Sequence, residues 1–134
     1  MRLIMSVSVK HKEVKTGLKN LMTHMKNDYN AWSMRGRTVH SNTEDFIRAT
    51  EIREGMEKRY ADGLGYDVNT KYIKVFSGAG GGKSVCCFVV ATETDKKFNF
   101  GDILKPAGFR GPTRNFARGN ILENDFHGVA WTGC

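Results

Sequence analysis

The sequence lacks the features that mark secreted, membrane-spanning and zinc-binding proteins. It has only three cysteines, of which Cys86 and Cys87 are adjacent and Cys134 stands apart. This spacing gives neither a disulfide framework nor a paired zinc site, and it is typical of reduced thiols in a cytosol. No stretch approaches the roughly 20 apolar residues of a membrane-spanning helix, and the apolar run after Met1 is too short for a signal peptide. We therefore expect a soluble, intracellular protein with no membrane partner.

Acidic residues are also scarce relative to basic ones. The 134-residue chain has 14 acidic and 21 basic residues, which gives a formal net charge of +7 and a pI near 9.5. Such an excess favours nucleic acid, nucleotides or acidic proteins as partners. The apolar content of 40% is close to the globular average and the length suits one core, so we expect residues 1–134 to form a single domain.

No catalytic or metal-binding motif stands out. The histidines and cysteines show no i, i+4 pair on a helix face and no C-x-x-C spacing, so we predict no metal site and no cofactor. A magnesium nuclease could use Asp67 with Asp95 and Lys97, but the Asp-x-Lys step falls in a predicted turn that does not aim both side chains at one site. Cys86 and Cys87 lie in a predicted strand, where they would point to opposite faces as core residues. We therefore favour a non-enzymatic protein with no catalytic residue.

The glycine-rich segment at residues 77–84 matches a phosphate-binding loop only in part. That motif requires a glycine five positions before Gly82, where Ser77 stands. It should also open a helix, whereas the residues after Ser84 are strand-like. We predict a hairpin connection, which could still approach an anion through its backbone.

Apolar periodicity predicts two helices in the first half of the chain, residues 1–65. In residues 10–30 the apolar side chains share one face, and four lysines form a rail on the adjoining flank: Lys12, Lys15, Lys19 and Lys26. Residues 31–40 show no period and are predicted to form a loop. Residues 41–46 combine a capping residue with two carboxylates, which is typical of a helix start. The apolar side of this second helix, which should stop at Gly63 or Gly65, consists of Phe46, Ala49, Ile52, Met56 and Tyr60.

The second half, residues 66–134, has the pattern of a small β-sheet. Residues 66–76 alternate and predict one strand, whereas residues 85–91 are apolar on both faces and predict a central strand. Residues 96–100 and 129–132 predict two further short strands. The fold class is therefore α+β, with two N-terminal helices packed on a small antiparallel β-sheet and a basic loop with a short helix before a final strand.

The segment from Gly101 to Ile121 is the clearest candidate for a binding site. It has no acidic residue between Asp102 and Glu123. Guanidinium groups form paired hydrogen bonds with phosphate oxygens, and aromatic rings offer stacking surfaces for bases. The candidate phosphate-binding residues are Lys105, Phe109, Arg110, Arg114 and Arg118, with the lysine rail of the first helix as a second basic contact.

Part of this basic segment has the boundaries of a short helix. Pro112 suits the first position of a helix and Gly119 suits its end. Such a helix would place Arg114 and Arg118 on one face and turn Phe116 toward the core. An alternative is that the arginines brace the fold by pairing with the acidic second helix, whose candidate partners are Glu51, Glu54 and Glu57. Binding site and internal brace both remain open at this point.

The same segment resembles the C-terminal signature of small uncharacterised proteins encoded by tailed bacteriophages. The signature runs Gly-Asp-Ile-x-Lys-x-Ala-x-aromatic and ends in Ala-Arg-Gly. Matching positions are Gly101, Asp102, Ile103, Lys105, Ala107, Phe109, Pro112, Ala117, Arg118 and Gly119. Phe109 stands where tryptophan is frequent, and Arg110 stands where lysine is frequent. The resemblance implies a phage origin, and hence the host cytoplasm, with a helical half before a hairpin and no established activity.

These observations favour a non-enzymatic bacteriophage accessory protein that binds a phosphate-bearing partner, above all nucleic acid, through the basic loop. Two alternatives stay open. The first is an inhibitor that uses its charge against an acidic surface of a host protein. The second is a small nucleotide-binding or hydrolytic protein, which would require basic and polar groups that converge in a cleft.

Overall fold

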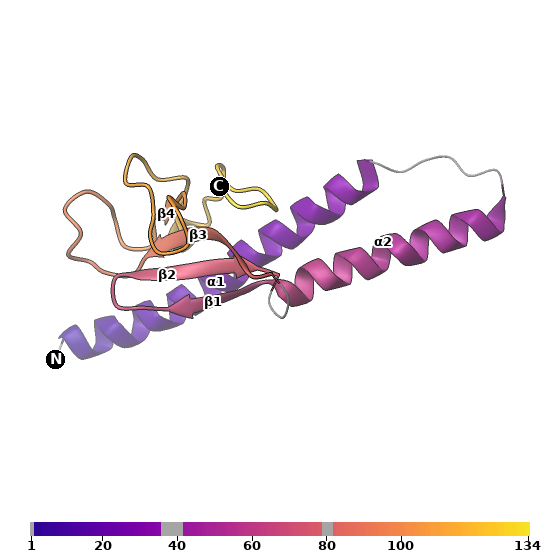
Figure 1. The fold of residues 1–134 in the computed structure, drawn as a ribbon. Helices are drawn as coiled ribbons and strands as arrows, with labels where there is room; N and C mark the ends of the chain where they lie inside the picture. The colour runs from indigo at the N-terminus through magenta and orange to yellow at the C-terminus, as the bar shows by residue number, and fades with distance from the viewer. Residues whose placement is uncertain (1, 36–41, 79–81) are drawn as a thin grey trace.

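The computed structural model describes residues 2–35, 42–78 and 82–134, with side chains described from Glu13 onward. Two N-terminal helices precede a four-stranded antiparallel β-sheet, which confirms the predicted α+β class (Figure 1). The elements are α1 (Arg2–Arg35), α2 (Thr43–Gly63), β1 (Gly65–Val68), β2 (Tyr72–Ser77), β3 (Ser84–Val90), β4 (Ile103–Leu104) and the 3₁₀ helix η1 (Ile121–Glu123). The strands lie in the order β1-β2-β3-β4. Within the described residues, no helix is long and apolar enough to cross a membrane.

Helix α1 crosses one face of the sheet. Its apolar stripe is buried as predicted and consists of Leu18, Leu21, Met25 and Tyr29. Gly17 allows the helix to approach η1 closely, because a Cβ at this position would lie 2.7 Å from the carbonyl oxygen of Ile121. The helix thus contacts both the sheet and the segment that follows the basic loop.

The predicted loop at residues 31–40 is wrong for residues 31–35, which continue α1. Trp32 anchors this extension, since its ring lies 4.8 Å from that of Trp131 and 5.6 Å from that of Tyr29, centroid to centroid. The contact with Trp131 joins distant parts of the chain and has no signature in the local sequence period. Residues 36–40 lie outside the described part of the chain.

Helix α2 begins and ends where the sequence predicts. The side chain of Asn42 caps it by accepting a hydrogen bond of 2.8 Å from the backbone N–H of Asp45, and Gly63 is its last residue. Much of its apolar side does not face a core, because Phe46, Ile52 and Met56 are at least 42% exposed. The reason is visible in Figure 1, where α2 runs away from the sheet beside the C-terminal part of α1.

The strand predicted at residues 66–76 is a hairpin of two strands. β1 and β2 pair in antiparallel register from Gly65 opposite Phe76 to Val68 opposite Ile73. Residues 69–71 form the turn, where the N–H of residue 69 donates to the carbonyl oxygen of residue 72. The turn has no glycine or proline, so the alternation continues across it without a break. β3 is central, as predicted, with β2 on one side and β4 on the other.

Two predicted strands and the predicted short helix do not form. Residues 96–98 bend because the Asp95 carboxylate accepts hydrogen bonds from the backbone N–H groups of Lys97 and Phe98, a local turn that competes with strand pairing. Residues 129–132 form a turn closed by backbone hydrogen bonds between Ala130 and Gly133. The fourth strand is instead β4.

The segment from Pro112 to Arg118 is an irregular strap across the sheet. Pro112 pairs with Pro106 in an isolated β-bridge, and the Arg118 N–H donates to the carbonyl oxygen of Ile103. Because backbone donors of this segment bond to residues far along the chain, they do not form the i, i+4 bonds of a helix.

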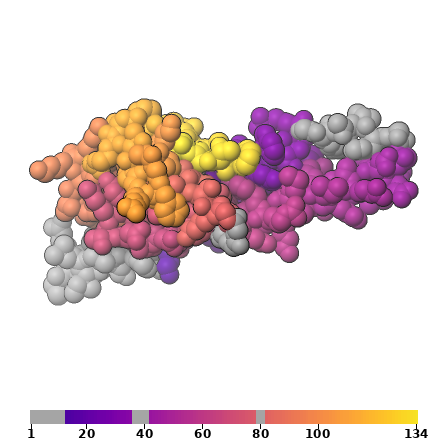
Figure 2. Space-filling view, viewed as in Figure 1, coloured from indigo at the N-terminus to yellow at the C-terminus, as the bar shows by residue number. Residues whose placement is uncertain are grey.

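Each face of the sheet is covered by a different part of the chain. The inner face meets α1 in the larger core, to which the sheet contributes Ile73, Val75, Cys87, Val89 and Ile103. The outer face meets residues 95–118 in a smaller cluster of Phe88, Val90, Phe98 and Leu104. In Figure 2 the orange segments lie over the upper part of the sheet, while α2 extends away from it.

The adjacent cysteines of β3 are core residues, as predicted, but they do not lie in separate cores. Val75 pairs with Cys87 and Phe76 pairs with Val85, so a β-bulge inserts Cys86 between two register positions. Both cysteines belong to the inner cluster and are no more than 3% exposed.

Candidate nucleic-acid interface

The outer face of the sheet brings Lys74 of β2 against the basic loop. Lys74 lies opposite Phe88 in the register of β2 and β3, and alternation places both on the face away from α1. The Lys74 ammonium lies 3.8 Å from the centroid of the Phe109 ring. The loop predicted to bind phosphate therefore folds back over β2 and shares one surface with it.

Residues 105–113 form a closed loop with an exposed tip. The N–H of Thr113 donates to the carbonyl oxygen of Lys105, and the N–H of Ala107 donates to that of Gly111. Phe109 is 52% exposed near the tip, and Lys105 and Arg110 are also exposed. The backbone bonds hold the loop shut at its base, so these side chains are presented to solvent on a fixed frame.

Arg114 is an internal brace. Its guanidinium forms two hydrogen bonds of 2.9 Å with the two carboxylate oxygens of Asp95 and a third with the hydroxyl of Tyr72. The Asp95 side chain is only 2% exposed, and the hydrogen bonds from Arg114, together with those from the backbone of Phe98 and Lys97, hold its pKa well below the usual range. The predicted pairing of an arginine with an acid is therefore present, but the acid is Asp95, not a glutamate of α2.

Arg118 and Phe116 form a separate pair at the end of the strap. The Arg118 guanidinium stacks 3.7 Å from the centroid of the Phe116 ring and donates to the side chain of Asn115. Phe116 is 60% exposed, so the prediction that it points to the core is wrong. Arg114 and Arg118 do not share a helix face, since the segment is not helical and each arginine has its own partners.

This surface also includes Lys71, Lys74, Lys83 and Lys97, which were not among the predicted phosphate-binding residues. Among the residues whose side chains the structure describes, the cations within 6.0 Å of an aromatic ring centroid are Lys71, Lys74, Lys83, Lys97, Arg114 and Arg118. We call these residues, with Lys105, Arg110 and the rings they contact, the basic–aromatic face. The local signals that could have indicated this surface are the alternation of Tyr72 and Lys74 in the strand and the adjacent pairs Lys71–Tyr72 and Lys97–Phe98. The pairs of Lys74 with Phe109, Lys83 with Phe76 and Arg114 with Phe98 join residues that are distant in sequence.

The lysine rail lies on a different part of the molecule. Lys15 and Lys19 are exposed and Lys26 is half-buried, whereas the side chain of Lys12 lies outside the described residues. α1 packs on the inner face of the sheet and the basic loop covers the outer face, so the sheet lies between them. The rail is therefore a surface separate from the basic–aromatic face.

The candidate nuclease carboxylates are engaged by separate cations. Asp67 forms an ion pair of 3.1 Å with Lys83, and Asp95 forms its pair with Arg114. Among the described residues, no group of three or more metal-ligating side chains is arranged to hold a metal ion.

The Asp95–Arg114 pair should make the free energy of unfolding depend on pH. Because the folded-state pKa of Asp95 is lowered, its stabilising effect is fully present above the unfolded pKa of about 4 and is lost as pH falls below it. Asp95→Asn keeps an acceptor for the backbone turn but removes the charge. We therefore expect Asp95→Asn to be less stable than the wild-type protein at neutral pH and the difference to shrink in acid. Urea unfolding of both proteins at neutral and acid pH checks this, and a difference independent of pH would contradict it.

No protein-family model, curated protein or solved structure matches this chain. The geometry and charge of the basic–aromatic face therefore carry the functional proposal.

Proposed function

We propose that this protein is a non-enzymatic binding protein for single-stranded nucleic acid and that the basic–aromatic face is its contact surface. The observation that carries the proposal is the pairing of cations with rings, as in Lys74 over Phe109 and Arg118 over Phe116. A carboxylate neutralises a lysine or arginine, whereas a ring contact leaves its charge available to a phosphate. The two rings are also more than half exposed and can stack on unpaired bases.

The distribution of charge supports the same surface. Between residues 66 and 118 the chain has nine basic and four acidic residues, whereas α2 has six acidic and four basic residues. Among the acids of the sheet half, Asp67 and Asp95 are engaged by cations, and Asp102 accepts a hydrogen bond from Asn120. Residues 66–118 therefore carry an excess of five positive charges, as does α1 with seven basic and two acidic residues, whereas the projecting helix α2 is net negative.

The C-terminal signature adds a proposal about origin. Its resemblance to small tailed-bacteriophage proteins covers the strap and the loop that form this face. We therefore propose that the protein is a phage accessory protein that binds nucleic acid in the host cytoplasm.

Fluorescence anisotropy with a labelled oligothymidylate tests the proposal. Each phosphate contact contributes about −0.7 to the slope of log affinity against log salt. Four contacts therefore predict a slope near −3 between roughly 50 and 200 mM salt. Single strands should bind more tightly than a duplex of the same length, because only unpaired bases can stack on the exposed rings. Absence of binding at low salt, or an affinity that does not change with salt, would overturn the proposal.

A further inference from the structure

A polar pocket adjoins the basic–aromatic face at one end of the sheet. It has a volume of about 500 Å³ and is lined by Thr70, Lys71, Thr92, Thr94, Asp95, Lys96 and Arg114. Its walls come from the β1–β2 turn, from the loop after β3 and from the strap. The N–H of Ala91 donates to the carbonyl oxygen of Lys71 at 2.9 Å, which ties the first two walls together.

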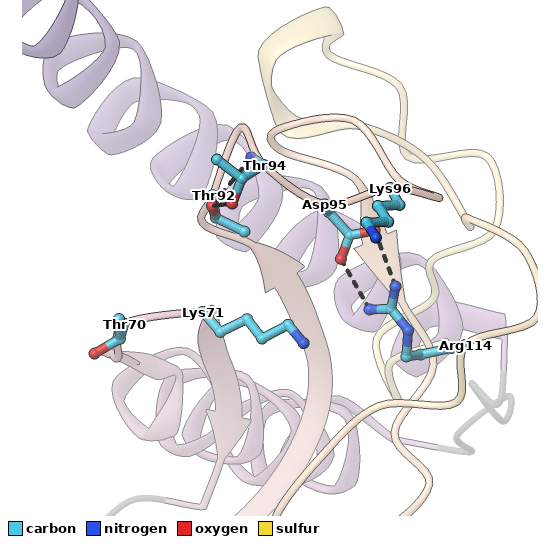
Figure 3. Close-up of a pocket in the computed structure, with 7 residues that line it drawn as sticks. All are labelled: Thr70, Lys71, Thr92, Thr94, Asp95, Lys96 and Arg114. Carbon is cyan, nitrogen blue, oxygen red and sulfur yellow. Dashed lines mark hydrogen bonds and ion pairs between the residues drawn. The ribbon is translucent and has the colours of Figure 1, made fainter.

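The cations of the pocket are available to a ligand. Figure 3 shows the Lys71 side chain reaching across the pocket toward the Asp95–Arg114 pair. Within the described part of the chain, no carboxylate forms an ion pair with Lys71 or Lys96. Arg114 uses both Nη atoms for Asp95 and Tyr72, yet its Nε–H and one Nη2 proton have no hydrogen-bond partner among the described residues.

Hydroxyl groups complete the lining. The hydroxyls of Thr92 and Thr94 lie 2.8 Å apart, and the Thr92 hydroxyl also accepts from the Thr94 N–H, so their positions are fixed. Thr70 lies at the rim (Figure 3). Ammonium, guanidinium and hydroxyl groups on several walls of one pocket match an anion with oxygens that point in several directions.

We propose that this pocket binds a phosphomonoester dianion, the terminal phosphate of a nucleotide. Three cations against one carboxylate give the lining a formal charge of +2, and a monoester has a charge of about −1.5 to −2 with three free oxygens. An internal phosphodiester has a single charge and fewer free oxygens. The volume is in the range of small-ligand sites. This inference rests on the proposed function in one respect, since it assigns the phosphate to the end of a strand bound on the neighbouring face.

The test compares three oligothymidylates of equal length, with a phosphate on the 5′ end, on the 3′ end or on neither. We expect one phosphorylated end to tighten binding about tenfold, the effect of one added set of charge-assisted hydrogen bonds. A variant with Lys71→Gln and Lys96→Gln should reduce this ratio to near one. The control variant Lys58→Gln and Arg59→Gln removes the same charge from exposed positions of α2 and should leave the ratio unchanged.

The outcomes separate this inference from the proposed function. Equal affinity for the three oligonucleotides overturns the pocket assignment and leaves nucleic-acid binding standing. If no oligonucleotide binds, the proposed function fails. A thermal shift with thymidine 5′-monophosphate then tests whether the pocket binds a phosphomonoester. A rise in melting temperature that requires Lys71 and Lys96 then assigns the dianion site to a free nucleotide, whereas no rise overturns it.

Discussion

Replacing Lys74, Lys105 and Arg110 with glutamine in one variant is expected to weaken binding of single-stranded DNA about 100-fold at low salt. Each side chain presents its charge on the basic–aromatic face, and Lys105 and Arg110 are exposed. Loss of three phosphate contacts should also flatten the salt slope by about 2. Fluorescence anisotropy over a salt series measures both quantities.

The matched control for this variant is on α2. Arg48, Lys58 and Arg59 are exposed there, and replacing them with glutamine removes the same charge from the projecting helix. We expect this variant to bind nearly as tightly as the wild-type protein and to keep its salt slope. Equal losses in the two variants would show that net charge alone drives binding and would contradict a defined surface.

Leu21→Ala is expected to lower the free energy of unfolding by about 3 kcal/mol, because truncation of a fully buried leucine leaves a cavity. Leu21 is 0% exposed and belongs to the core between α1 and the inner face of the sheet. For a chain of this length the loss corresponds to a fall in melting temperature of about 10 °C. Urea and thermal unfolding measure the two effects.

Leu122→Ala provides the comparison, since Leu122 is the same residue type at 36% exposure. We expect a loss below about 1 kcal/mol there. Below its melting temperature, Leu21→Ala should still bind oligothymidylate, because the sheet separates α1 from the basic–aromatic face. A small loss for Leu21→Ala would contradict the packing of α1 on the sheet.

Local rules predict the boundaries of α2 and the central strand. Asn42 caps α2 through its own side chain, Gly63 is the last residue of the helix, and residues 85–91 are apolar on both faces because β3 is covered on both sides. These features depend on residues next to one another in sequence. The buried stripe of α1 is predicted for the same reason, since its period is a property of one helix.

Features that depend on distant partners were not predictable. The acid that braces Arg114 is Asp95, which lies in a turn 19 residues earlier, and nothing in the sequence distinguishes it from the glutamates of α2. The helix expected from Pro112 does not form, because backbone N–H groups of the strap donate hydrogen bonds to the carbonyl oxygens of Ile103 in β4 and of Lys105. Lys74 joins the candidate site only through the fold, which places it under Phe109.

The most direct test of the nucleic-acid interface is an NMR titration of the ¹⁵N-labelled protein with oligothymidylate. Amide shifts should change from Lys71 to Lys74 and from Lys97 to Arg118, which together form the outer face. The chemical shifts of the α2 amides between Arg48 and Arg59 should not change. Shift changes confined to α1 or α2, with the outer face unaffected, would contradict the account.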